Sequence, residues 1–212
     1  GDVYIGSGET EIVRCIAQAA RSLRLQYPDI RFHISSGNAA FVIEQLDKGL
    51  IDFGLMYTAA DPAKYDFVEI PIHDVWGVLM RRDSPLAQKD SISPEDLWDK
   101  PLILSQQPND GWFLSQWMKK DLSKLNVAAT YNLLFNASLL VEEGLGYTVC
   151  FDKLINTSGN SNLCFRPLNP RLESTAYLVW KKYQIFSKAS EKFLRQLQKA
   201  FAQQENADEN VS

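Results

Sequence analysis

The stretch Arg31-Phe-His-Ile-Ser-Ser-Gly-Asn38, followed by a short apolar segment and then by Ile51-Asp-Phe-Gly-Leu-Met-Tyr57, decides the fold. It has the order of a strand, a turn containing asparagine, a short helix and a second strand. The same order returns in Thr130–Asn136, a second apolar segment, and Gly146–Phe151. Two such units predict two similar Rossmann-like α/β lobes with parallel strands, and a small ligand would bind in the cleft between them.

The other apolar segments extend this pattern along the chain. Alternation and short apolar runs predict further strands, which are Val3–Gly6, Phe67–Ile72, Val75–Arg81, Leu102–Leu104, Leu163–Leu168 and Ala176–Trp180. Apolar side chains at helical spacing predict helices over Glu11–Gln26, Ala39–Lys48 and Ser187–Gln203.

The order of these elements predicts that the chain crosses between the lobes twice, near His73–Asp74 and near Asn169–Leu172. Lobe I would comprise residues 1–73 and 171–204, and lobe II residues 74–170, joined by a two-strand hinge. Residues 205–212 are polar without periodicity, so we expect a disordered tail. The chain opens almost directly in a strand without methionine or a signal peptide, which suggests a truncated or processed chain.

Composition narrows the function. The 212 residues carry a net charge of −4, so they lack the basic surface of a nucleic-acid-binding domain. No apolar run reaches the roughly 18 residues of a membrane-spanning helix, and we expect no membrane contact. The cysteines Cys15, Cys150 and Cys164 have no metal-ligand spacing and are expected to be buried, reduced thiols, although a redox pair between Cys150 and Cys164 stays open.

The sequence contains no recognisable catalytic constellation. Gly6-Ser7-Gly8 is not a nucleophile elbow, and it lacks the third glycine of a dinucleotide-binding motif. We therefore expect a protein that is not an enzyme and that holds no cofactor and no metal. An enzyme on the same hinged fold would need a reactive side chain in the cleft.

Several motifs, in their order and spacing, resemble the effector-binding domain of LysR-type transcriptional regulators, which has the type 2 periplasmic-binding-protein fold. The motifs are Val3–Gly6, Gly49–Leu55, Arg82–Ala87, Ile92–Leu97, Pro101–Ile103 and Leu140–Gly146, and the resemblance spans residues 2–202. The chain departs from the family pattern at Glu142-Glu143, where an alanine pair is usual, and at Phe151-Asp152, where a proline is usual.

The resemblance implies a ligand-sensing module of a cytoplasmic bacterial regulator. A winged helix-turn-helix domain and a linker helix, both absent from this chain, would precede it and supply the only contact with DNA. The effector would change the arrangement of the DNA-binding domains. The family also implies a homodimer, or a tetramer of the full-length protein, in which the helix Glu11–Gln26 and the following strand pair with a second subunit. The alternative is a periplasmic or lipid-anchored solute-binding protein of a transporter.

In the family the effector is held by loops that follow the parallel strands. Carried over to this chain, these loops offer Ser7, Gly8, Glu9, Thr10, Ser36, Gly37, Asn38, Tyr57 and Thr58 in lobe I, and Ser105, Gln106, Gln107, Asn136 and Ala137 in lobe II.

The residues support a binding role independently, because several of these loops run into helix starts whose N–H groups favour a carboxylate or phosphate. Thr10, Ser36 and Asn38 could equally serve as helix caps. The loops contain no Arg or Lys, and Glu9 and Asp110 lie near them in the sequence. This favours a mono-acid, an amino acid or a neutral compound, with Tyr57 and Trp112 as a candidate apolar wall.

Overall fold

The chain folds into two compact α/β units. The computed structural model describes residues 1–58, 60–106 and 108–212, and for residues 108–112 it describes the backbone alone. Unit 1 comprises Gly1–His73 and Thr175–Ser212, and unit 2 comprises Asp74–Ser174. The α/β fold class predicted from the repeated strand–helix–strand pattern is confirmed.

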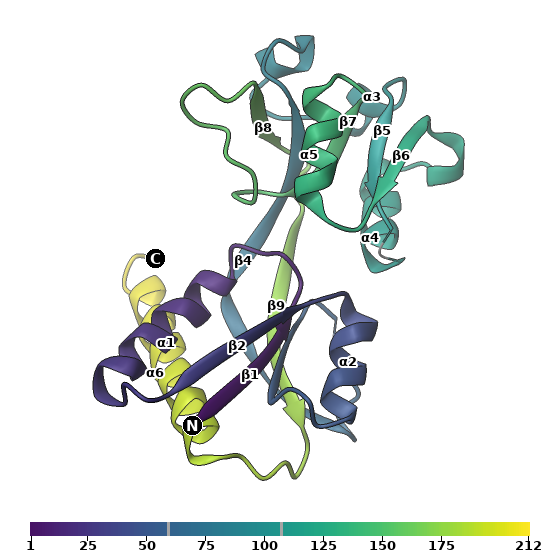
Figure 1. The fold of residues 1–212 in the computed structure, drawn as a ribbon. Coiled ribbons are helices and arrows are strands. Elements are labelled where there is room, and N and C mark those ends of the chain that lie inside the picture. Colours follow the sequence, from purple (N-terminus) through teal and green to yellow (C-terminus); the bar gives the residue numbers. More distant parts are fainter. Residues whose placement is uncertain (59, 107) are drawn as a thin grey trace. The chain divides into compact units, whose positions relative to one another are not determined.

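The sheet of unit 1 has the strand order β2-β1-β3-β9-β4 (Figure 1). Its strands are β1 (Asp2–Ser7), β2 (Arg31–Ser36), β3 (Phe53–Met56), β4 (Tyr65–Arg81) and β9 (Glu173–Lys181). β1 lies in the middle of a parallel group, with β2 on one side and β3 on the other, and β9 then adds antiparallel to β3. The carboxyl ends of β1, β2 and β3 therefore lie at one edge of the sheet.

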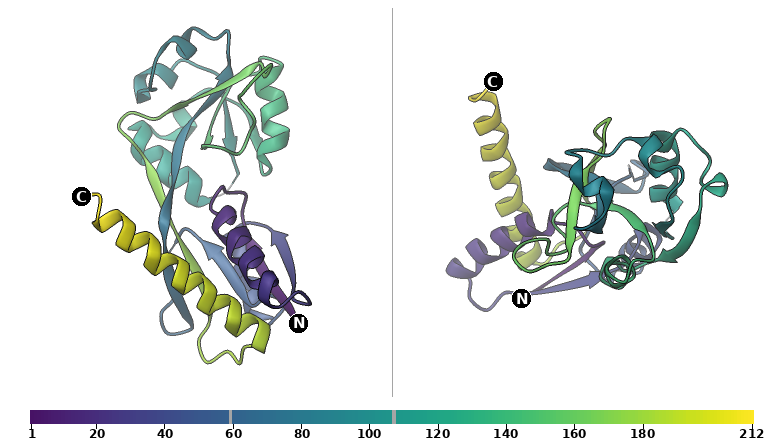
Figure 2. Two further views of the ribbon diagram at one scale, coloured as in Figure 1. Left: turned by 90° about the vertical axis from the view of Figure 1, so that its left-hand side faces the viewer. Right: turned by 90° about the horizontal axis from the view of Figure 1, so that it is seen from above.

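Helices cover both faces of this sheet. The helices α1 (Val13–Gln26) and α6 (Lys188–Glu209) lie side by side on one face (Figures 1 and 2). Their apolar side chains, Phe193 of α6 among them, pack in one core with Phe53 of β3. The helix α2 (Ala39–Asp47) covers the other face with a separate apolar cluster. Each face of the sheet is therefore buried, as the apolar strands require.

Unit 2 repeats this arrangement. Its strands are the second half of β4 together with β5 (Leu102–Ser105), β6 (Val127–Tyr131), β7 (Tyr147–Phe151) and β8 (Leu163–Pro167). β5 pairs parallel with both β6 and β7, and β4 lies between β7 and β8 with antiparallel pairing to both. The helices α3 (Pro94–Leu97) and α4 (Pro108–Met118) pack on one face and α5 (Leu134–Glu142) on the other. Two short 3-10 helices, Pro85–Gln88 and Leu122–Lys124, complete the unit.

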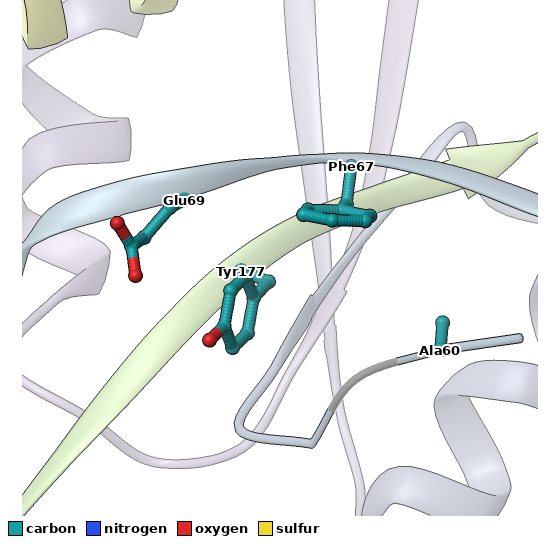
Figure 3. Close-up of a pocket in the computed structure, with 4 residues that line it drawn as sticks. All are labelled: Ala60, Phe67, Glu69 and Tyr177. Carbon is teal, nitrogen blue, oxygen red and sulfur yellow. The ribbon is translucent and has the colours of Figure 1, made fainter. Parts of the chain in front are cut away.

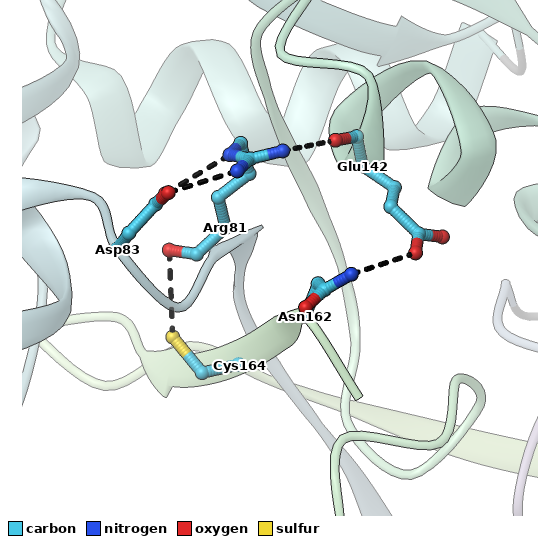
Figure 4. A network of polar contacts seen from close by, with 5 residues as sticks. All are labelled: Arg81, Asp83, Glu142, Asn162 and Cys164. Carbon is cyan, nitrogen blue, oxygen red and sulfur yellow. Dashed lines mark hydrogen bonds and ion pairs between the residues drawn. The ribbon is translucent and has the colours of Figure 1, made fainter. Parts of the chain in front are cut away.

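A guanidinium at the end of β4 fixes the end of α5 (Figure 4). Arg81 makes two hydrogen bonds to the Asp83 carboxylate, at 2.9 and 2.8 Å, and its Nη1 donates to the carbonyl of Glu142. The Asp83 carboxylate raises the pKa of Arg81 further, so the guanidinium stays charged. The Glu142 side chain accepts a hydrogen bond from Asn162 at 3.4 Å, and the sulfur of Cys164 lies 4.0 Å from the Arg81 carbonyl. One charged group thus satisfies the last turn of a helix and joins three segments of unit 2.

The structure differs from three expectations. The strands expected at Phe67–Ile72 and Val75–Arg81 are one continuous strand, because His73 and Asp74, which were expected to separate them, are themselves extended. The second passage between the units falls between Ser174 and Thr175, within β9 and past the expected range. The expected disorder of residues 205–212 was wrong for most of that segment, since α6 runs to Glu209, where Glu205, Ala207 and Glu209 favour helix although Asn206 and Asp208 do not.

Among the described glycines of unit 2, Gly77 has the closest neighbours around an added side chain. A Cβ there would lie 2.1 Å from Phe165 Cζ and 2.5 Å from the carbonyl oxygen of Arg166. We expect Gly77→Ala to lower the free energy of unfolding by about 1–3 kcal/mol, because overpacking must displace backbone. Chemical denaturation measures this change. The matched control is Gly8→Ala, whose Cβ would meet only the Gly37 carbonyl at 3.7 Å; equal stability of the two variants would contradict the packing described.

Candidate effector site

The loops after β1 and β2 lie next to each other at the carboxyl edge of the unit 1 sheet. The parallel register places Ser7 opposite Ser36, and the Gly37 N–H donates to the Ser7 carbonyl at 3.0 Å. Gly8 follows at once, and a Cβ added there would lie 3.7 Å from the Gly37 carbonyl oxygen. Ser7 is buried, with its hydroxyl donating to the Gly8 carbonyl at 2.8 Å. The structure thus brings together four of the predicted site residues, Ser7, Gly8, Gly37 and the exposed Ser36.

Both loops end in side chains that cap a helical turn. The Asn38 side chain accepts a hydrogen bond from the Phe41 N–H at 2.9 Å at the start of α2. The Thr10 hydroxyl accepts from the Ile12 N–H at 3.0 Å and is itself buried, just before α1. The capping role that the sequence left open is therefore present for Asn38, whereas Thr10 closes a turn ahead of α1, whose N-cap residue Ile12 makes no side-chain capping bond. Capping of this kind also holds the neighbouring N–H groups in place for a ligand.

The electrostatics of this edge favour a weakly anionic or neutral ligand. The N–H groups of Ala39 and Ala40, in the first turn of α2, have no acceptor within the described part of the chain. They point along the positive end of the helix dipole. The loops 7–10 and 36–38 carry no basic side chain, and Glu9 is exposed beside them. A single carboxylate would be stabilised here by N–H groups, whereas a polyanion would lack counter-charges.

The third strand of the parallel group ends in Tyr57 and Thr58. Both residues are half-buried, and the Tyr57 ring packs against the main core of unit 1. Since β3 pairs parallel with β1, these two residues follow the same edge of the sheet as Ser7 and Gly8. All nine predicted site residues of unit 1 therefore belong to this edge.

In unit 2 the corresponding edge begins with the loop after β5. Ser105 ends the strand half-buried, and Gln106 follows it exposed. The Gln106 N–H donates to the Tyr131 carbonyl at 2.8 Å, and its side-chain amide donates to the Thr130 hydroxyl at 3.2 Å. Gln106 is thus tied to β6, which leaves its side-chain oxygen as the group available to a ligand.

The remaining predicted residues of unit 2, Asn136 and Ala137, lie in α5 and not in the loop that follows β6. The helix α5 begins at Leu134, so Asn136 lies exposed within its first turn, and the residue equivalent to Asn38 is Leu133. Ala137 is fully buried in the core, and its N–H already donates to the Leu133 carbonyl at 3.3 Å. The expected turn at Asn136–Ala137 was therefore wrong by one helical turn. The apolar spacing from Leu134 to Ala137 and Val141 was the signal that could have shown it.

Three expectations fall on residues that the structure leaves undescribed. Gln107 lies outside the described residues, and the side chains of Asp110 and Trp112 do as well.

A hollow in unit 1 was not found by sequence reasoning. It has a volume of about 320 Å³ and is lined by Ala60, Phe67, Glu69 and Tyr177 (Figure 3). Phe67 and Tyr177 read in the sequence as ordinary strand residues. The one available signal was the placement of Phe67 and Glu69 two residues apart, which puts both on one face of a strand.

The described thiols do not form a redox pair. Cys150 lies opposite Gly77 on β7, and Cys164 lies opposite Met80 on β8, so the two cysteines flank β4 from opposite sides. Strands two positions apart are roughly 10 Å from each other, beyond the reach of a disulfide. Burial raises the pKa of Cys150 to about 12 and that of Cys15 to about 11, which makes both poor nucleophiles at neutral pH.

The described part of the chain shows neither a metal-ligand cluster nor a membrane-spanning helix. No group of three or more His, Cys, Asp or Glu side chains is placed to hold a metal ion there. Among the same residues, no helix has the length and apolarity to cross a bilayer.

Comparison with known proteins assigns the family. Residues 1–202 match the sequence model of the LysR substrate binding domain, and the chain belongs to this family. The HTH-type transcriptional regulator YvbU of Bacillus subtilis is 22% identical over 204 residues, which are 95% of this chain and 68% of that protein. The Hca operon transcriptional activator HcaR of Escherichia coli is 25% identical over 183 residues, 84% of this chain and 61% of HcaR. The family match confirms the resemblance and favours a regulatory domain over a transporter's solute-binding protein.

Solved structures share the fold. The effector-binding domain of QuiR in complex with shikimate matches with a TM-score of 0.79 and 18% identity, over 96% of this chain and 98% of that chain. The BenM effector-binding domain with its effector benzoate matches with a TM-score of 0.74 and 18% identity, over 96% and 93% of the two chains. These likenesses confirm the expected type 2 periplasmic-binding-protein fold.

The cap at Asn38 gives a test of this local geometry. We expect Asn38→Ala to lower the free energy of unfolding by about 1 kcal/mol, because the Phe41 N–H loses its acceptor. Asn38→Asp keeps an acceptor of the same shape and should stay within a few tenths of the parent value. Thermal unfolding followed by circular dichroism measures both. An equal loss in the two variants would show that the side chain does not cap α2.

Proposed function

We propose that this chain is the effector-sensing domain of a LysR-type transcriptional regulator. The match of residues 1–202 to the family carries the proposal. The chain spans 61% of the length of HcaR and 68% of that of YvbU, and both relatives are named as transcriptional regulators. DNA contact would belong to a separate helix-turn-helix domain, consistent with the net charge of −4 of this chain. The regulator would act in the bacterial cytoplasm and would not be an enzyme.

The proposed effector is a small organic acid with a single carboxylate. The support lies in the edge formed by the loops after β1, β2 and β3, which offers backbone N–H groups and the polar side chains of Thr10 and Asn38, while none of the nine predicted residues there is basic. Two relatives of the same fold are described with such acids, QuiR with shikimate and BenM with benzoate. Ser105 and Gln106 are the corresponding candidates on unit 2. An effector controls the regulator only through a different affinity for its conformations.

We also propose that the regulator forms homodimers. Exposed apolar side chains support this, since Leu25 and Ile34 stand on α1 and β2 and Phe135 and Leu139 stand on α5. Surfaces of this kind are typical of contacts between protein chains. The larger assembly of the full-length protein would be a tetramer.

Calorimetric titration with benzoate, shikimate and the neutral analogue benzamide tests the assignment of the ligand. We expect an acid to bind more tightly than the amide, and we expect Thr10→Val and Asn38→Ala each to weaken that binding by about 3- to 10-fold, the value of one hydrogen bond. Asn206→Ala, an exposed amide in α6, is the control and should bind as the parent does. Unchanged affinity in both loop variants would contradict this site.

A further inference from the structure

The hollow beside β4 has two aromatic walls and one acidic one (Figure 3). Phe67 and Glu69 stand on the same face of β4, and Tyr177 comes from the neighbouring strand β9. The rings of Phe67 and Tyr177 are perpendicular, with an interplanar angle of 89° and centroids 5.6 Å apart. Ala60, after β3, lies on the side of the rings away from Glu69. The two rings form a corner that is open to solvent, since 51% of the Phe67 surface is exposed.

The charge of this corner is negative. Glu69 is exposed and has no ion-pair partner within the described part of the chain, whereas the nearby Asp66 lies 4.0 Å from the Lys182 ammonium. Among the described residues, no basic side chain lines the hollow. The faces of aromatic rings carry negative partial charge and attract cations, most strongly those with little hydration such as alkylated ammonium groups. A carboxylate beside two ring faces adds a full charge of the same sign.

We propose that the hollow lined by Phe67, Glu69 and Tyr177 is a binding site for a small organic cation carrying an alkylated ammonium group. Its volume of about 320 Å³ suits a ligand of that size. An anionic ligand would be repelled by Glu69, and a neutral apolar ligand would cover this carboxylate without neutralising it. The site shares no residue with the loops proposed for the effector acid, so the two binding proposals can be tested separately. A ligand there would touch both strands that run from unit 1 into unit 2.

Titration with choline, compared with its uncharged isostere 3,3-dimethylbutan-1-ol, tests the proposal on the 212-residue protein. The two probes have the same shape, so a difference between them reports the charge. We expect saturable binding of choline by calorimetry and binding of the neutral isostere that is at least about tenfold weaker. Absence of saturable choline binding up to high millimolar concentration, or equal binding of the two probes, would overturn the proposal.

Two substitutions locate the binding. Glu69→Gln keeps the size of the side chain and removes its charge, and Phe67→Leu keeps an apolar wall and removes a ring face; each should weaken choline binding by about 3- to 10-fold. The controls are Glu191→Gln on α6 and Phe135→Leu on α5, which change an exposed carboxylate and an exposed ring elsewhere. Both controls should bind choline as the parent does. Choline affinity in Glu69→Gln equal to that in Glu191→Gln would overturn the assignment to this hollow, even if Phe67→Leu failed to fold.

Discussion

The parallel pairing of β1 with β2 and β3 is the constraint on which the rest of unit 1 depends. It places three strand ends at one edge, and the bond from the Gly37 N–H to the Ser7 carbonyl joins the first two loops directly. Glycine on two of these strands lets α2 pack closely above them. A Cβ at Gly6 would lie 2.7 Å from the Ile51 side chain, and one at Gly54 would lie 2.4 Å from Val42. Sheet and helix packing together therefore fix where α2 begins, and so where its N–H groups point.

The chemistry of the proposed site follows from this backbone arrangement more than from any special side chain. Hydrogen-bond donors converge at the edge, but no full positive charge accompanies them, so the site should select ligands with one carboxylate or none. Unit 2 repeats the topology with a loop of the same length after β6, in which Leu133 takes the place of the capping Asn38. The two edges thus offer different chemistry on similar frames: a capped, polar helix start in unit 1 and an apolar one in unit 2.

The sequence predicted those features that depend on local pattern. The spacing of apolar residues located most helices and strands, and the glycines and the asparagine around α2 marked its start and end. It failed where tertiary context decides. His73 and Asp74 looked like the gap between two strands, yet β4 continues through them. The asparagine at position 136 looked like the partner of Asn38, although the buried face of α5 requires the helix to begin earlier. The hollow at Phe67 could not be foreseen, because it depends on the pairing of strands more than 100 residues apart in the chain.

Hydrogen–deuterium exchange of the backbone amides, with and without the acid that most raises the unfolding temperature, tests the central claim most directly. The account predicts slower exchange in two segments, residues 7–12 and 37–42, because a bound carboxylate would engage the amides at the carboxyl edge of β1 and β2. The helix α6 lies on the face of the unit 1 sheet opposite to α2. Exchange at the exposed end of α6 should therefore be unchanged. Protection that is absent from both segments, with the acid bound, would contradict the assignment of this edge as the sensing site.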